Sequence, residues 1–213
     1  MAVSARNVGH LLGVAVVTAW ALSALVDIRH AAAGPCPDVE VVSARGTDEL
    51  PGPGPTGQAF IDSLRAKIPG RSVEVYGVNY PATYDFARSL SAGADDAHAH
   101  VQSTVANCPN TRVVLTGYSQ GAAVIDIITE QLPPEVADHV AAVAVFGNPE
   151  STYARTLGGR QIPAISPLYR PKTIDLCVPD DPICSEGNIE AAHHLYAQNG
   201  MTDQAAEFAA SRL

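Results

Sequence analysis

Short apolar runs rich in valine alternate along the chain with longer stretches in which apolar residues recur at helical spacing. The apolar runs are continuous instead of alternating with polar residues, which predicts strands buried on both faces. The stretch over 56–68 places Phe60, Leu64 and Ile68 on one side of a helix. The whole pattern predicts strands at 39–44, 72–80, 111–118, 140–146 and 173–177, and helices at 56–68, 95–106, 120–131 and 202–211.

This alternation of strands and helices predicts an α/β fold with a parallel sheet of about five strands and helices on both faces. Right-handed crossovers make such a sheet doubly wound, and its functional residues then gather at the carboxyl ends of the strands. No internal repeat or domain linker interrupts the 213 residues, and this length suits one domain.

The N-terminal segment has the features of an export signal. Residues 11–26 carry no charge, Arg6 precedes them, and Ala31 to Ala33 supply a small-residue cleavage pattern. The apolar run is shorter than the roughly 20 residues that a membrane span needs. We therefore expect a signal peptide over 1–33 and a secreted mature domain over 34–213. The alternative is a retained anchor, since Asp27 and Arg29 make the region before the cleavage pattern unusually polar.

Charge and composition exclude some partners. The net charge is −9, and the 13 basic residues are scattered along the chain. Nucleic acid is not an expected partner, because phosphate binding needs clustered cations. A hydrophobic content of 46% is too high for a disordered chain and suits a packed core.

Four cysteines lie in the expected mature domain: Cys36, Cys108, Cys177 and Cys184. An even number after an export signal indicates two disulfides. The short separation favours Cys177 with Cys184, which leaves Cys36 for Cys108. A zinc site is the competing interpretation, but the sequence contains no Cys-x-x-Cys pair.

The pentapeptide from Gly117 to Gly121 has the form Gly-x-Ser-x-Gly, with Ser119 at its centre. It falls between a predicted strand and a predicted helix, which is the setting of a nucleophile elbow. The sharp reversal exposes the serine, and glycines avoid collisions with the neighbouring strand and helix. The alternative is an ordinary turn in which the serine caps the helix. The sequence favours Ser119 as a catalytic nucleophile.

A serine nucleophile needs a base, and in this type of sheet the base follows the acid along the chain. Three histidines follow Ser119: His139, His193 and His194. His139 directly precedes a predicted strand, so it lies at the amino end of the sheet, away from the expected site. His193 and His194 follow the last strand, and both remain candidates.

The acid should lie just beyond the end of a strand. Asp180 and Asp181 do so, inside the loop that the Cys177–Cys184 pair would close. Asp175 is the runner-up, within the last strand. Two backbone donors are also needed to bind an oxyanion. We expect one at Gln120, directly after the serine, and the other at Thr47 in the loop after the first strand.

These residues resemble the cutinase family, specifically the cutinase-like serine esterases of actinobacteria. The resemblance covers essentially all of 36–213. Its landmarks are Cys36-Pro37, Ala44 to Thr47, Tyr76 to Pro81, Cys108 to Arg112, Gly117 to Gly121, Asp138 to Val143, Phe146-Gly147, Cys177 to Cys184, and Ala192-His193 with Tyr196.

The resemblance implies a small α/β-hydrolase without a large lid and with the two disulfides named above. It implies Ser119 as nucleophile, Asp181 as orienting acid and His193 as base. It also implies oxyanion donors at Thr47 and Gln120, with no metal or organic cofactor.

Two positions depart from the family pattern. The histidine is doubled: counting from Cys184 favours His194, whereas the frame formed with Tyr196 favours His193, which we choose. Ser43 stands where the family often has an aromatic residue, and here we expect only a change in packing.

The implied activity is hydrolysis of short- to medium-chain acyl esters through an acyl-enzyme. We expect a monomer that acts on a small ester or lipid and contacts a lipid or polymer surface transiently, either secreted or held at the cell envelope. Phospholipase A, thioesterase and acyltransferase activities would use the same residues. A non-catalytic secreted binding protein is the alternative of another class, and a peptidase is a weaker one.

Overall fold

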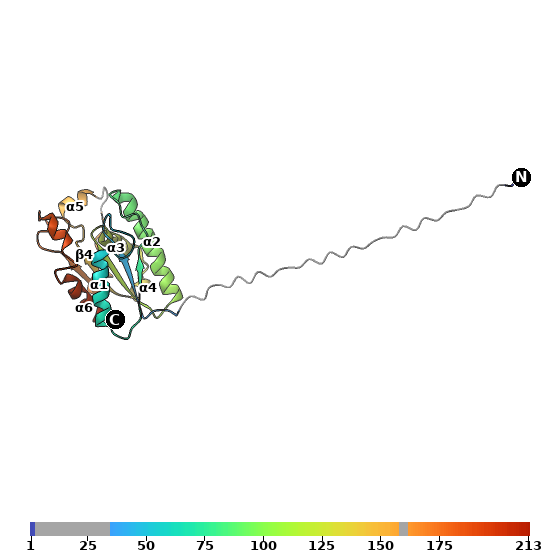
Figure 1. The fold of residues 1–213 in the computed structure, drawn as a ribbon, viewed down its shortest axis with the longest axis horizontal. Coiled ribbons are helices and arrows are strands. Elements are labelled where there is room, and N and C mark those ends of the chain that lie inside the picture. The colour runs from blue at the N-terminus through green and yellow to red at the C-terminus, as the bar shows by residue number, and fades with distance from the viewer. Residues whose placement is uncertain (3–34, 158–161) are drawn as a thin grey trace. The chain divides into compact units, whose positions relative to one another are not determined.

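A five-stranded parallel sheet forms the centre of the unit Pro35–Leu213 (Figure 1). Its strands are β1 (Val39–Ala44), β2 (Val73–Gly77), β3 (Arg112–Tyr118), β4 (Val140–Phe146) and β5 (Thr173–Leu176), in the order β2-β1-β3-β4-β5. This computed structural model describes residues 1–2, 35–157 and 162–213. The predicted signal peptide lies almost wholly outside the described residues. The predicted parallel sheet is confirmed.

The strand order reverses direction at β1. The chain passes outward from β1 to β2, and then returns across the sheet to β3, β4 and β5. Strands β1 and β3 are parallel neighbours, with Val42 paired to Leu115. The loop after β1 leads toward one edge of the sheet and the loop after β3 leads toward the other, so a gap opens between the two loops. A doubly wound sheet binds its ligands at such a point, beyond the carboxyl ends of the strands.

Helices cover both faces of the sheet, as predicted. On one face α1 (Gly54–Lys67) and α6 (Met201–Ala210) pack over Val41 and Val114. On the other face α2 (Phe86–Asn107) and α3 (Gln120–Gln131) pack over Val42 and Leu115. Figure 1 shows α1 beside α6, with α2 across the sheet from them. The continuous apolar strands follow from this double coverage, since both faces exclude water.

Helix α2 is longer than its sequence pattern predicts. It begins at Phe86 instead of 95, and the Asp85 side chain caps it by accepting a bond from the Arg88 N–H at 3.3 Å. Serines and Gly93 make its first turns resemble a loop, since such residues have low helix propensity. Gly93 is nevertheless required, because a Cβ there would lie 2.8 Å from Val124 Cγ2 on α3. Close packing of α2 on α3 thus outweighs the local preference.

Other boundaries differ by less. Strand β2 ends at Gly77, so the predicted strand over 72–80 is too long. Two short helices, α4 (Pro134–Ala137) and α5 (Thr152–Leu157), had no sequence signal. At Ser43 the side chain is buried and its Oγ lies where a Cβ on Gly57 would come within 2.5 Å. The small residue at this position therefore lets α1 pack closely, while the expected change in packing relative to the family stays a prediction.

Both predicted disulfides are present. Cys36 is bonded to Cys108 and Cys177 to Cys184. The first joins the start of the domain to the end of α2, and the second closes the loop after β5. All four sulfur atoms are in disulfides, so none is left as a thiolate for zinc. Within 35–157 and 162–213, none of the helices combines the length and apolar character needed to cross a membrane.

Candidate active site

Ser119 occupies a strained turn between β3 and α3. Its φ is 54° and its ψ is −119°, a conformation that non-glycine residues rarely adopt. A Cβ on Gly117 would lie 2.4 Å from the Gly121 carbonyl oxygen, and one on Gly121 would lie 1.9 Å from the Ala44 oxygen. The two glycines therefore let strand, turn and helix meet at this point. The predicted nucleophile elbow has the expected backbone geometry.

His193 lies between Ser119 and Asp181. Its Nε2 is 2.9 Å from Ser119 Oγ, and its Nδ1 is 2.8 Å from Asp181 Oδ2. His193 belongs to the short 3-10 helix η2 (Glu190–His194), which follows the disulfide loop. The neighbouring His194 lines the same cleft, but among the described residues it makes no hydrogen bond to the serine or the carboxylate. Of the two candidate histidines, the structure brings His193 to the serine.

Two features fix the His193 ring. The Tyr118 hydroxyl donates to the His193 carbonyl at 2.6 Å, and the two rings stack with centroids 5.0 Å apart. Gly147 also lies against the ring: its φ is 56°, and a Cβ there would come 2.9 Å from His193 Cε1. Tyr118 thus holds the imidazole in place, and the absence of a side chain at Gly147 leaves room for the ring.

Asp181 is fully buried at the other end of the hydrogen-bonded series. Its Oδ2 also accepts a bond from the Tyr196 hydroxyl at 2.6 Å, and its Oδ1 accepts one from the Ile183 N–H at 2.8 Å. Burial by itself would raise the pKa of Asp181, but the hydrogen bonds from His193, Tyr196 and Ile183 outweigh it and lower that pKa below its ordinary value. The carboxyl group is therefore ionised at neutral pH.

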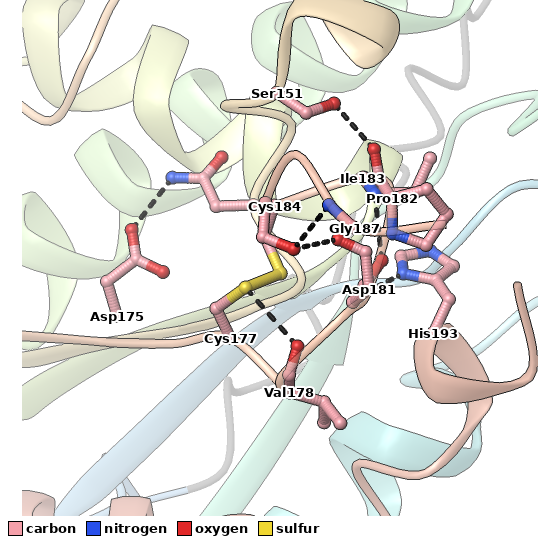
Figure 2. The surroundings of a disulfide bond; sticks show 12 residues. Ser151, Asp175, Cys177, Val178, Asp181, Pro182, Ile183, Cys184, Gly187 and His193 are labelled. Atoms are coloured by element: carbon pink, nitrogen blue, oxygen red, sulfur yellow. Dashed lines mark hydrogen bonds and ion pairs between the residues drawn. A yellow bond between two sulfur atoms is a disulfide. The ribbon is translucent and has the colours of Figure 1, made fainter. Parts of the chain in front are cut away.

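The disulfide holds the loop that carries Asp181. Figure 2 shows the Cys177–Cys184 bond next to Asp181, whose carboxylate points toward His193. Asp180 is exposed and has a φ of 66°. The runner-up, Asp175, points the other way and accepts a bond from the Asn148 amide at 3.1 Å. Of the three candidate acids, only Asp181 meets the histidine.

The loop after β1 presents Thr47 to the cleft. The buried Arg45 side chain ties this loop down by donating to the Glu49 carbonyl and to the Tyr80 carbonyl, each at 2.7 Å. The Gly46 N–H donates to Glu49 Oε2 at 2.7 Å and closes the turn around Thr47. In the part of the chain that the structure describes, the N–H groups of Thr47 and Gln120 have no hydrogen-bond partner. Both donors are free to bind a negative oxygen.

A cleft of about 580 Å³ opens over Ser119 and His193. The Gln120 side chain holds one wall, because its Nε2 donates to the Thr83 carbonyl at 2.9 Å, next to Tyr84. Helix α5 contributes Tyr153, Ala154 and Leu157 to the lining. The cleft's apolar lining comes from Tyr84, Phe86, Leu90, Ala123, Tyr153, Leu157, Ile162 and Ile183.

Two tyrosines at the site make contacts that the sequence did not predict. Tyr118 is the variable residue of the Gly-x-Ser-x-Gly pattern, and Tyr196 is only a landmark of the family resemblance. Each hydroxyl bonds a residue 15 or more positions away, Tyr118 to His193 and Tyr196 to Asp181. No local pattern reports such a contact.

The doubly wound sheet, the elbow at Ser119 and the hydrogen bonds through His193 to Asp181 together define an α/β-hydrolase. The family model for cutinase matches residues 35–213. The chain belongs to the cutinase family and is a carboxylic ester hydrolase.

Named relatives agree with this membership. The protein called Carboxylesterase Culp1 from Mycobacterium tuberculosis is 57% identical over 210 residues, which cover 98% of this chain and 97% of that protein. Phospholipase Culp4 from the same species is 47% identical over 220 residues, covering 99% of this chain and 93% of that protein. A Trichoderma reesei cutinase in complex with a C11Y4 phosphonate inhibitor has a TM-score of 0.69 and 32% identity, and covers 83% of this chain and 77% of that one.

Proposed function

We propose that this protein is a secreted serine esterase in which Ser119 is the nucleophile, His193 the general base and Asp181 the orienting acid. One observation supports this most directly: Ser119 Oγ, the His193 ring and the Asp181 carboxylate are joined by hydrogen bonds of 2.9 and 2.8 Å below an open cleft. A serine hydroxyl is a weak nucleophile until an adjacent base takes its proton. The contact with His193 supplies that base.

The reaction proceeds by acyl transfer. His193 Nε2 takes the Ser119 proton as Oγ bonds to the ester carbonyl carbon, and the carbonyl electron pair moves onto its oxygen. The N–H groups of Thr47 and Gln120 stabilise this oxyanion. When the tetrahedral intermediate collapses, the bond to the alcohol breaks and His193 gives its proton to the leaving oxygen. Water, deprotonated by the same histidine, then attacks the acyl carbonyl; as the bond to Ser119 Oγ breaks, His193 returns the proton to Oγ and the free acid leaves.

Asp181 assists in both halves of the reaction. Because its pKa is lowered, the carboxylate is charged at neutral pH and stabilises the imidazolium that forms in each step. Its bond to Nδ1 also directs Nε2 toward the serine.

The substrates we propose are esters with short- to medium-chain acyl groups. The cleft is of the size that accommodates small ligands, and apolar side chains make up most of its lining. One relative is named a carboxylesterase and another a phospholipase. A phospholipid arm therefore belongs in any substrate panel.

Secretion is supported by the N-terminal charge and alanine pattern and by the two disulfides, which form in oxidising compartments. We propose that a monomer acts there or at the cell envelope, with transient contact to a lipid or polymer surface. N-terminal sequencing of protein recovered from the culture medium tests this. A chain that starts near 34 is the expected result, and an uncleaved chain that keeps residues 1–33 contradicts the predicted signal peptide.

Labelling with a fluorophosphonate probe tests the nucleophile. Wild-type protein and Ser91→Ala, which changes an exposed serine on α2, should both be labelled, whereas Ser119→Ala should not. A panel of esters from about two to eighteen carbons, together with a phospholipid, then defines the substrate. Folded wild-type protein that neither reacts with the probe nor cleaves any ester would support the binding-protein alternative.

A further inference from the structure

Tyr196 lies three residues beyond His193 and is fully buried. Its hydroxyl donates to Asp181 Oδ2 at 2.6 Å, the same oxygen that lies 2.8 Å from His193 Nδ1. The hydroxyl also accepts a bond from the Val178 N–H at 3.1 Å, at the start of the disulfide loop. One side chain thus joins the end of β5 to the carboxylate at the active site.

The direction of these bonds follows from the atoms involved. A backbone N–H is always a donor, so Tyr196 must accept from Val178 and keeps its single proton for another partner. An ionised carboxylate only accepts, and it is a stronger acceptor than the Cys184 sulfur, which lies 3.2 Å from the hydroxyl. The proton therefore points to Asp181.

The hydroxyl stays a donor over the working range of pH. Burial, followed by the hydrogen bond to Asp181, raises the pKa of Tyr196 well above its ordinary value. The ring is fixed as well, because it packs edge-on against Phe146 at 6.1 Å and against His193 at 6.2 Å between centroids. Tyr196 thus presents one oriented proton to the carboxylate.

We propose that Tyr196 is a positioning residue of the active site, which holds the Asp181 carboxylate in place and sets how strongly it attracts the His193 proton. The proposal rests on the proposed function. Tyr196 touches neither the substrate nor Ser119 in this scheme. It acts through Asp181, by sharing the oxygen that faces the imidazole.

The direction in which removal of the Tyr196 hydroxyl changes the proton affinity of His193 can be worked out. Without the hydroxyl, Oδ2 presents more negative charge to His193, so the imidazolium is stabilised and holds its proton to higher pH. The base is then less available for attack, and the carboxylate is less well aimed. The other titratable groups around the pair are Glu49, Tyr118, Asp180, Glu190 and His194. Among the described residues, none of their side chains bonds to the Asp181 carboxylate. Loss of the Tyr196 hydroxyl should therefore change the proton affinity of His193 through Asp181.

The Tyr196→Phe variant tests the proposal, since it removes the hydroxyl and keeps the ring. We expect kcat to fall about tenfold, as for the loss of one hydrogen bond to a charged group, with KM unchanged. We also expect the acidic limb of the pH profile of kcat/KM to move to higher pH. Tyr169→Phe is the matched control, because it removes a hydroxyl of a fully buried side chain that has no hydrogen-bond partner among the described residues. It should leave kcat and the pH profile unchanged.

Replacing Tyr196 by 3-fluorotyrosine provides a second measurement that does not depend on folding of the phenylalanine variant. Its more acidic hydroxyl is a stronger donor, so the acidic limb should move to lower pH. If both variants show the wild-type kcat and pH profile, the positioning role is wrong, while fluorophosphonate labelling of Ser119 would still support the esterase. If Ser119→Ala keeps full activity, the proposed function itself fails.

Discussion

Two buried carboxylates in this protein are each bonded to a histidine and a hydroxyl. Glu40, near the amino end of β1, lies 2.8 Å from His100 Nε2 and accepts a bond from the Thr104 hydroxyl at 2.6 Å. Asp181, beyond the carboxyl end of β5, has the same two kinds of partner at the same distances, in His193 and Tyr196. The two clusters are nearly identical in chemistry and lie toward opposite ends of the sheet.

The difference lies in what the histidine meets next. The second nitrogen of His193 reaches the strained Ser119, whereas the ring of His100 stacks on Tyr76 with centroids 3.4 Å apart. The Glu40 cluster therefore links β1 to α2 and supports the fold. A buried carboxylate–histidine pair can drive a reaction only where the fold also supplies a nucleophile and an open cleft.

The largest expected difference between the clusters is in activity. Asp181→Asn should lower kcat by about 10⁴-fold, because an amide cannot stabilise the imidazolium and disturbs the histidine tautomer. The matched variant Glu40→Gln should keep the wild-type kcat. Steady-state kinetics on a chromogenic ester measures both, with circular dichroism as the check on folding. Equal losses in the two variants would show that the clusters are not functionally distinct.

The doubled histidine provides the next comparison. His193→Ala should lower kcat by about 10⁶-fold, because Ser119 then has no base. His194→Ala should change kcat by less than about threefold, since its side chain lies outside the hydrogen-bonded series. The same ester assay measures both variants. The assignment of the base is wrong if the two results are reversed.

The two disulfides are expected to differ in whether their loss affects mainly stability or mainly activity. Cys36 and Cys108 close a sequence separation of 72 residues, so replacing both by alanine should cost about 4 kcal/mol of unfolding free energy. Cys177 and Cys184 close only 7 residues, and their loss should cost about 2 kcal/mol. Replacing the second pair should nevertheless lower kcat more than replacing the first, because the loop that it closes carries Asp181. Urea unfolding and ester hydrolysis of both double variants test this, and the same ranking in the two assays would contradict it.

The smallest effect concerns the stability that the Glu40 cluster contributes. Burial by itself would raise the pKa of Glu40, but the bonds from His100 and Thr104 lower that pKa below its ordinary 4.5. A lowered folded-state pKa gives stability that is present above about pH 4.5 and is lost as the pH falls through the folded-state value. Glu40→Gln should therefore cost about 1–3 kcal/mol near neutral pH, and less in acid. Urea unfolding across that range measures the difference, and a difference that grows in acid would refute this sign.

Much of the scaffold was predictable from local pattern. The bounds of β1, β4 and α3 coincide with the predicted 39–44, 140–146 and 120–131. These elements are buried on most sides, so their apolar runs leave little ambiguity. The start of α2 was not predictable, because its serines and Gly93 disfavour a helix in isolation. Packing against Val124 makes the helix form there.

The active site, too, has a part that local sequence predicts and a part that depends on tertiary packing. Gly117, Ser119 and Gly121 determine the elbow by themselves, because the steric demands of a strand–turn–helix reversal act within five consecutive residues. Local pattern left two histidines and two neighbouring aspartates open; the family resemblance chose His193 and Asp181, and the folded chain brings these two together beside the serine. Only the tertiary structure shows that the Tyr196 hydroxyl completes the carboxylate's bonds. These side chains come from loops whose orientation depends on long-range packing and on the second disulfide. A short motif determines its own backbone, but only the folded sheet brings distant loops to within hydrogen-bonding distance.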